Sequence, residues 1–245
     1  MLGIKSGRSK GAKEEGEKPF WISFSDLMTA LMVLFLVAMA VALMAVTEGL
    51  EQIKRIEKDR SDTIHSCVTD IRSVASAPEF KGVVVKDSSI EFGPLAEFRH
   101  DSSDLNESQQ RFLRQFVPKV LEVATHKSCQ AWLKRVVVDG YASQEGSYLY
   151  NLNLSFKRSQ RILCVLLDSK GQGALDLEQR KLIRSLFFPG ASSFMSEKVL
   201  DPAQSRRVEL RLEFWEPNPE TGGADKKARP DIRWDEDAKC PSDPK

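Results

Sequence analysis

The chain lacks an excess of charge of either sign. Its 245 residues include 36 Lys and Arg against 35 Asp and Glu, which gives a formal net charge of +1. Direct nucleic-acid binding usually requires a strongly basic surface, so this balance gives no reason to expect a nucleic-acid partner. The length allows one or two domains.

Motifs of covalent catalysis are missing as well. The sequence contains no GxSxG, no Walker-type GxxxxGK and no HExxH run. Its three histidines, His65, His100 and His126, are scattered without the spacing of metal ligands, and we assign them no role. We therefore expect a protein that is not an enzyme and that uses neither an organic cofactor nor a metal.

Cysteines are few, and none lies in a zinc pattern such as paired CxxC. The four are Cys67, Cys129, Cys164 and Cys240. They are compatible with an oxidising compartment, where disulfides persist. One or two structural disulfides and buried thiols both remain open, because four cysteines allow three full pairings.

The sequence does contain one long apolar run near its start. Residues Trp21 to Val46 read WISFSDLMTALMVLFLVAMAVALMAV, with a single charge. Such a run is long enough to cross a hydrocarbon core about 30 Å thick as one helix. A cleaved signal peptide is the alternative, but its apolar region is usually about 7–15 residues long. We expect one transmembrane helix, residues 20–46.

Basic residues precede this run and predict its orientation. Residues 1–19 contain Lys5, Arg8, Lys10, Lys13 and Lys18. Because Lys and Arg stay on the cytoplasmic side, residues 1–19 are expected to be a cytoplasmic tail and the C-terminal domain to be periplasmic.

A carboxylate lies within the apolar run, where a charged group costs a few kcal/mol on insertion scales. Asp26 can carry a proton, because lipid favours its neutral form and water its charged form. Thr29 lies one turn further along the same face, and the small and medium side chains beyond it suit close helix packing. We predict that Asp26 and Thr29 bind protons. The alternative is a boundary residue that snorkels to the interface.

The remaining chain is predicted to hold a linker, a folded domain and a tail. Residues 47–78 have apolar side chains at helical spacing, which predicts an amphipathic helical linker able to pair with a second copy of itself. Residues 79–215 alternate strand-like and helix-like segments, which predicts an α+β sandwich of two layers. The expected strands are near 83–92, 133–138 and 208–215, and the helices near 106–124, 148–168 and 177–188, with a loop from Pro189. Residues 216–245 are predicted to be a flexible tail.

The residues around Asp26 resemble a known membrane motif. The run DLMTALMVLF, which begins at Asp26, is similar to the motif of the flagellar stator subunit MotB, in which the Asp binds the translocated proton. The resemblance implies a homodimer, with protons as the coupling ion, inside a ring of a multi-span MotA-like partner. Five copies of this partner are expected around two of this chain.

A second resemblance lies in the domain. Residues Gly140 to Leu163 read GYASQEGSYLYNLNLSFKRSQRIL, which resembles the signature of OmpA-like peptidoglycan-binding domains. The match implies that Tyr150, Asn151, Leu154 and Arg158 bind peptidoglycan. It also implies that Arg158 holds a carboxylate of diaminopimelate, since its planar fork can donate two parallel hydrogen bonds.

One departure from this signature concerns the ligand. The Thr-Asp pair of the family is replaced by Ala142-Ser143, so the acidic group that would contact the ammonium of diaminopimelate is absent there. Asp139 and Glu145 are the nearest acidic candidates, but neither stands at the matching position. A fold used only for dimerisation is the alternative.

The two motifs together resemble the MotB-like subunit of Zorya anti-phage defence systems. This resemblance implies a peptidoglycan-anchored, ion-conducting subunit of a motor in the bacterial inner membrane. The motor would be driven by the proton-motive force, and the multi-span partner would be ZorA-like. The alternatives are a flagellar stator subunit, a TolR- or ExbD-like energiser, and a passive envelope anchor without ion flux.

Overall fold

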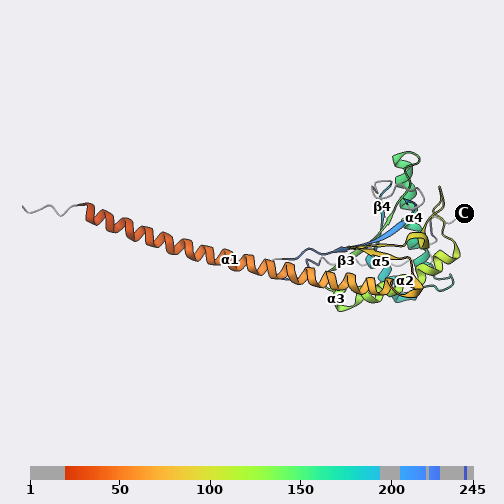
Figure 1. Ribbon diagram of the computed structural model, residues 1–245, viewed down its shortest axis with the longest axis horizontal. Helices are drawn as coiled ribbons and strands as arrows, with labels where there is room; N and C mark the ends of the chain where they lie inside the picture. The colour runs from red at the N-terminus through yellow and green to blue at the C-terminus, as the bar shows by residue number, and fades with distance from the viewer. Residues whose placement is uncertain (1–19, 194–204, 219–220, 227–239, 242–245) are drawn as a thin grey trace, which may run out of the picture. The chain divides into compact units, whose positions relative to one another are not determined.

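The computed structural model describes residues 20–193, 205–218, 221–226 and 240–241 (Figure 1). The chain divides into two compact units, Met1–Gln52 and Ile53–Lys245, and each is described by itself. The expected cytoplasmic tail, residues 1–19, lies outside the described residues.

The first unit contains the start of helix α1 (Phe20–Ala75). Within the described residues this is the one helix long and apolar enough to cross a membrane, with a mean hydropathy of 2.7 in its apolar window. Large apolar side chains such as Leu31, Leu34 and Phe35 are exposed all along this segment. Exposed apolar surface of this extent is typical of a helix covered by lipid or by other membrane helices.

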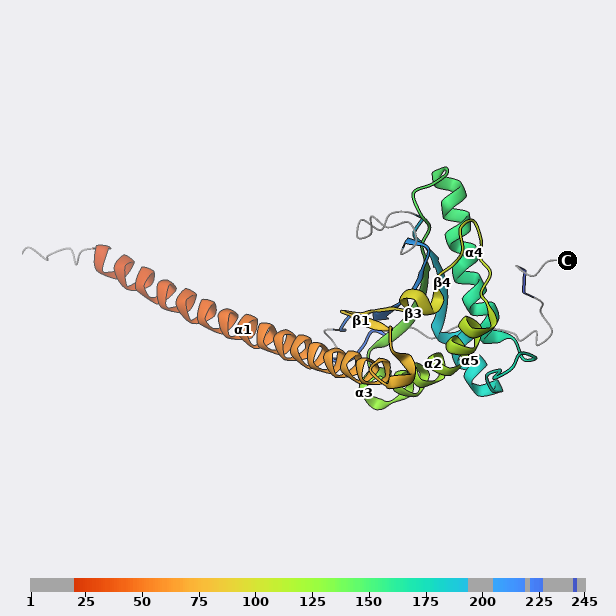
Figure 2. The same ribbon diagram turned by 45° about the vertical axis from the view of Figure 1, so that its right-hand side comes forward.

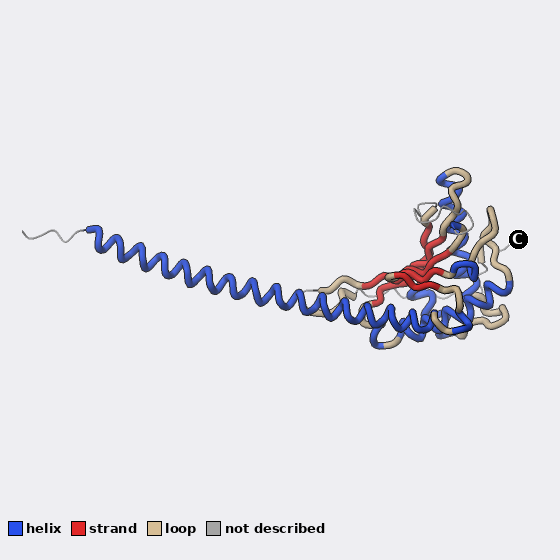
Figure 3. The backbone as a smooth tube through the Cα atoms, viewed as in Figure 1, coloured by secondary structure: helices blue, strands red, loops and turns tan. Residues whose placement is uncertain are grey.

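The second unit is built on a five-stranded sheet, which Figure 3 shows as one group of strands with helices beside it. Its strand order is β1-β2-β5-β3-β4, and all neighbours are antiparallel except β3 and β4. The strands are β1 (Val84–Lys86), β2 (Ser89–Glu91), β3 (Leu133–Gly140), β4 (Phe187–Ala191) and β5 (Val208–Phe214). The antiparallel β3–β5 pair forms the middle of the sheet.

Helices form the second layer of this unit (Figure 2). They are α2 (Glu107–Thr125), the short α3 (Lys127–Gln130), α4 (Tyr148–Leu167) and α5 (Leu177–Leu186). Asn106 begins α2 with a capping box, since its side chain accepts from the Gln109 backbone while the Gln109 side chain accepts from the Asn106 backbone. Val136 and Val138 of β3 are fully buried in a single apolar core shared with these helices. The predicted α+β class with two layers is confirmed.

The predicted linker is in part a piece of the domain. Helix α1 runs without interruption to Ala75, and its last turns place Cys67, Val68 and Ile71 in the core. A disulfide joins Cys67 to Cys129 of α3. The boundary expected at residue 78 is therefore corrected, because the last turns of this helix pack into the core of the domain, whereas Leu50 and Ile53 further up the same helix are exposed.

Strand β4 was not predicted. The sequence near Phe187 continues the helical spacing of α5, but α5 ends at Leu186 and the chain enters the sheet in parallel with β3. The expectations of a helix reaching Phe188 and of a loop from Pro189 were wrong. Pro189 and Gly190 are tolerated because β4 is an edge strand, where one side of the ladder needs no hydrogen bonds.

Described parts of the predicted tail contact the domain. The Lys226 side chain donates a hydrogen bond to the backbone carbonyl of Gln130, and Cys240 forms a disulfide with Cys164 of α4. Within the tail, Pro217 and Ala224 form an isolated β-bridge. All four cysteines are therefore paired, which decides between the alternatives left open by the sequence. The rest of residues 216–245 lies outside the described residues.

Candidate functional site

The membrane candidate is a pair of polar residues on one face of α1. Asp26 and Thr29 are three residues apart, so their side chains are neighbours on the helix surface. The Thr29 hydroxyl donates a 2.8 Å hydrogen bond to the backbone carbonyl of Asp26. Thr29 therefore satisfies its donor on its own helix, and the Asp26 carboxylate is exposed on the surface of the first unit.

The second candidate is built where strand β3 ends and helix α4 begins. The Ser147 side chain caps α4 by accepting from the backbone N–H of Tyr150. Gly140, the last residue of β3, lies so close to α4 that an added Cβ would overlap the carbonyl of Ser155. The absence of a side chain at Gly140 thus lets the third turn of α4, at Ser155, lie directly against the end of the strand.

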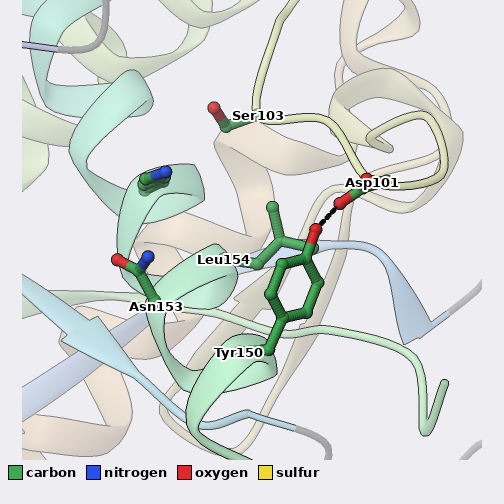
Figure 4. Close-up of a pocket in the computed structure, with 6 residues that line it drawn as sticks. Asp101, Ser103, Tyr150, Asn153 and Leu154 are labelled. Carbon is green, nitrogen blue, oxygen red and sulfur yellow. Dashed lines mark hydrogen bonds between the residues drawn. The ribbon is translucent and has the colours of Figure 1, made fainter. Parts of the chain in front are cut away.

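Two of the four predicted wall-binding residues face a pocket. Tyr150 and Leu154, one turn apart, line an open pocket of about 120 Å³ (Figure 4). The Tyr150 hydroxyl donates a hydrogen bond to the carboxylate of Asp101. The remaining lining residues are Asp101, Ser103, Asn153 and Lys157.

The other two predicted residues point inward. Asn151 is 1% exposed, and its side-chain amide donates a 2.9 Å hydrogen bond to the backbone carbonyl of Glu145. This bond ties the loop between β3 and α4 to the helix. The side chain of Asn151 is therefore held inside the domain, and its predicted role in binding peptidoglycan stays a prediction.

Arg158 is fully buried, and its guanidinium donates to three backbone carbonyls. Nε bonds Ser102 at 3.0 Å, Nη1 bonds Tyr141 at 2.7 Å and Nη2 bonds Arg99 at 3.2 Å. Burial and the nearby charge of Arg206 lower the pKa of Arg158 to about 10, while Asp101 acts in the opposite direction. The side chain thus stays charged at neutral pH. In this structure the guanidinium of Arg158 binds three backbone carbonyls, whereas the sequence motif implies that it binds a carboxylate of the ligand.

The acidic group expected near the pocket comes from a different segment. Asp139 is 5% exposed and pairs with Arg211 at 2.7 Å, whereas Glu145 pairs with His100 at 2.6 Å on the surface. Neither lines the pocket, but Asp101 does. Sequence reasoning missed Asp101, since nothing in its local sequence links its loop to α4.

Lys157 and Asn153 were missed too, although a signal was present. They follow Tyr150 by seven and three residues, which places all three on one face of α4.

No group of three metal-ligating side chains gathers anywhere in the described residues.

One family model and one relative match this chain in sequence. Residues 5–54 match a family model described as membrane MotB of the proton-channel complex MotA/MotB. The chain is 41% identical over 219 residues to the Zorya protein ZorB of Escherichia coli O139:H28 (strain E24377A / ETEC), covering 88% of each chain.

Solved structures similar to this chain include three bacterial domains. One is the OmpA-like domain of FopA1 from Francisella tularensis, with 20% identity, 55% of this chain and 82% of that one covered, and a TM-score of 0.34. The second is the peptidoglycan-associated lipoprotein of Burkholderia pseudomallei, which is 17% identical. The match covers 57% of this chain and 99% of that one, with a TM-score of 0.36. The third is the periplasmic domain of Helicobacter pylori MotB, which is 12% identical. The match covers 54% of this chain and 80% of that one, with a TM-score of 0.38.

Proposed function

The chain belongs to the family of the Zorya protein ZorB, and on this premise we propose that it is the peptidoglycan-anchored, ion-conducting subunit of a rotary membrane motor that acts in anti-phage defence. The observation that carries the proposal is Asp26, the single carboxylate in the apolar run 21–46 of α1, which lies inside the residues matched by the MotB model. An ionisable group in such a segment is by default a functional group.

Asp26 is the proposed proton site, with Thr29 beside it. Two copies of α1 would lie within a ring of a multi-span MotA-like partner, with five copies of the partner around the two helices. A proton bound at Asp26 removes its charge and changes how the carboxylate interacts with the ring. Each charge that crosses the membrane makes available about 2.3 kcal/mol per 100 mV of membrane potential.

The domain of the second unit is the proposed anchor. With the N-terminus in the cytoplasm, this domain lies in the periplasm, where its two disulfides persist. Tyr150 and Leu154 would contact the peptidoglycan peptide, while Asn151 and Arg158 hold the surrounding loops. Fixed to the wall, the subunit would resist rotation so that the partner ring turns.

Replacement of Asp26 tests the motor. Co-expressed with its multi-span partner, Asp26→Asn should abolish both proton uptake by proteoliposomes and protection against phage, because an amide cannot take up a proton. Asp26→Glu should retain part of both. The matched control is Asp59→Asn, the same change at an exposed position further along α1. Proton uptake and protection at wild-type levels in Asp26→Asn would rule out the motor and leave a passive anchor.

Retention on purified peptidoglycan sacculi tests the anchor. The full-length chain in mild detergent should sediment with sacculi, and Arg158→Ala should reduce the retained fraction because the loops around the pocket lose their support. Equal retention of wild type and Arg158→Ala would remove Arg158 from the site. A wild-type chain that stays in the supernatant would refute the wall-anchoring function.

A further inference from the structure

The segment that follows strand β5 lies against helix α1. It comprises residues 215–218 and 221–226, and we call it the strap. We propose that the strap is a releasable clasp, which fixes residues Ile56–Arg60 of α1 to the domain when closed and frees them when open. The clasp is independent of the motor proposed above, whereas its effect on phage protection rests on that function.

Two residues of α1, about one turn apart, contact the strap. The Nε atom of Arg60 donates a 2.9 Å hydrogen bond to the backbone carbonyl of Trp215, and its Nη2 atom lies 3.5 Å from the Glu216 carboxylate. Gly222 lies against Ile56, since a Cβ added to this glycine would be 3.8 Å from Cδ1 of Ile56. Ile56 and Arg60 are both half-buried, while the residues beside them on α1 are exposed.

The strap has a fold of its own and is attached to the domain at both ends. Three backbone hydrogen bonds within it turn the segment back on itself. At its start, the backbone N–H of Trp215 donates a 2.8 Å hydrogen bond to the carbonyl of Trp132. At its end, the Lys226 ammonium donates a 3.1 Å hydrogen bond to the carbonyl of Gln130. The strap therefore connects α1 to the edge of the domain.

The strap is held less firmly than the part of α1 that enters the core. Every described residue of the strap is exposed or half-buried. Further along α1, Cys67 and Ile71 are fully buried, and a disulfide joins Cys67 to Cys129. Segments with few buried contacts open locally at a lower free energy than the core of a domain. The strap can therefore open while α1 stays attached from Cys67 onward.

The closed strap gives α1 a second point of attachment, at Arg60, seven residues before Cys67. At a rise of 1.5 Å per residue, the two points are about 10 Å apart along the helix. With the strap open, the turns before Cys67 are free to bend away from the domain. With the strap closed, their direction is fixed, so that in the proposed motor a load on α1 reaches the anchor without bending the helix.

Spin labels measure whether the strap fixes α1. The native cysteines are paired, so labels attach to the thiols introduced by Lys54→Cys on α1 and Lys119→Cys on α2. The full-length labelled chain is studied in mild detergent by double electron–electron resonance, diluted with unlabelled chain. The chain with an intact strap should give one narrow distance distribution, and Arg60→Ala should lose this peak. The matched control is Lys58→Ala, which removes an exposed cation from the same helix and should keep the peak.

Two results of this measurement would overturn the proposal. A peak in Arg60→Ala as narrow as in the control would show that the strap does not hold α1. A broad distribution in the chain with an intact strap would show that the strap is not closed.

Hydrogen exchange measures whether the strap opens by itself. The backbone amides of the strap should exchange faster than those of β5 in the wild type. Arg60→Ala should speed exchange in the strap about tenfold, as expected when a hydrogen bond from a charged donor is lost, and leave β5 unchanged. Strap amides that exchange as slowly as those of β5 would mean that the strap opens only when the domain unfolds, which contradicts release.

A disulfide can replace the contacts of Arg60. The sulfur of Ile56→Cys takes the place of a γ atom, and Cγ1 of Ile56 lies 3.9 Å from the Cβ position of Gly222→Cys, close to disulfide geometry. Arg60→Ala should lower phage protection, and the same chain with this cross-link, confirmed by mass spectrometry, should recover it. Gly222→Cys with Arg60→Ala but without Ile56→Cys is the control, because it has the same strain at φ of 68° and no cross-link.

The outcomes separate the clasp from the motor. A cross-link that does not form would show that Gly222 does not lie on Ile56, and a cross-linked chain without recovered protection would show that Arg60 acts in another way. Wild-type protection in Arg60→Ala would show that the clasp bears no load. Each of these results overturns the proposal. If Asp26→Asn keeps protection, the motor is refuted, while spin labels and hydrogen exchange still decide the clasp.

Discussion

The Nη1 atom of Arg158 donates a 2.7 Å hydrogen bond to the backbone carbonyl of Tyr141, which joins helix α4 to the residue after strand β3. The same guanidinium reaches the loop at Arg99 and Ser102, and it lies 5.3 Å from the centre of the Phe98 ring. One buried cation thus connects three segments that are distant in sequence. The wall of the pocket depends on it, although it does not line the pocket.

Removal of this side chain should destabilise the domain. In Arg158→Ala three carbonyls lose a hydrogen bond to a charged group, and each such bond contributes about 1.5–3 kcal/mol. We expect the free energy of unfolding to fall by about 3 kcal/mol or more, measured by urea titration with circular dichroism. Lys157→Ala, on the adjacent exposed residue, should change it by less than about 0.5 kcal/mol. Equal stability of the two variants would mean that Arg158 does not support the fold.

Close packing of β3 against α4 makes Gly140 a second sensitive position. An added Cβ there would overlap the backbone of Ser155, which cannot move without shifting the helix. Gly140→Ala should lower the free energy of unfolding by about 1–3 kcal/mol, the usual cost of overpacking. Gly223→Ala is the matched control, because its Cβ would meet only the Thr221 hydroxyl at 4.0 Å. A thermal unfolding midpoint in Gly140→Ala equal to that of the control would contradict this packing.

The elements predicted from the sequence are those specified by local pattern. Helix α4 and strand β5 have regular apolar spacing and lie where they were expected, within a few residues. Strand β4 was missed because a helical pattern runs directly into it, and its pairing with β3 is a non-local contact. The disulfide partners were undetermined for the same reason, since Cys67 and Cys129 are 62 residues apart.

Two of the residues named by the motif, Tyr150 and Leu154, line the candidate pocket, and their binding role stays a prediction. The motif could not distinguish an arginine that meets a ligand from one that holds backbone. That distinction depends on the loop at Arg99–Ser102, because the backbone carbonyls of Arg99 and Ser102 accept hydrogen bonds from the Arg158 guanidinium. Asp101 enters the pocket from this loop, so it could be found only once the loop was placed in space.

Alkaline pH should reveal the environment of Tyr141. Burial raises the pKa of its phenol above the usual 10.0, and the negative charges of Glu209 and Asp139 raise it further. A hydrogen bond with Ser192 and the positive charge of Arg207 act in the opposite direction but are smaller. The folded state therefore keeps the proton longer than the unfolded state. Its contribution to stability is complete below pH 10 and is lost as pH rises through the folded-state pKa.

Comparison with Tyr141→Phe isolates this effect. The free energy of unfolding of the wild type should fall more steeply with pH above about 10 than that of the variant, which has no proton to lose. Urea titrations at about pH 8 provide the reference, because the phenol is neutral there in both states. Parallel pH profiles for the two chains would show that the Tyr141 phenol titrates alike when folded and unfolded.

The two disulfides should differ in their contribution to stability. Cys67 and Cys129 are both fully buried and join two elements of the core, so their joint replacement by alanine should lower the free energy of unfolding by about 2–4 kcal/mol. Replacement of Cys164 and Cys240 should cost less, even though that disulfide spans 76 residues rather than 62. The reason is that Cys240 belongs to no helix or strand, so the folded chain also gains freedom when this bond is lost. Urea titrations of the two double variants under non-reducing conditions check the order. A larger loss for Cys164 and Cys240 would mean that restriction of the unfolded chain alone sets the contribution of each disulfide.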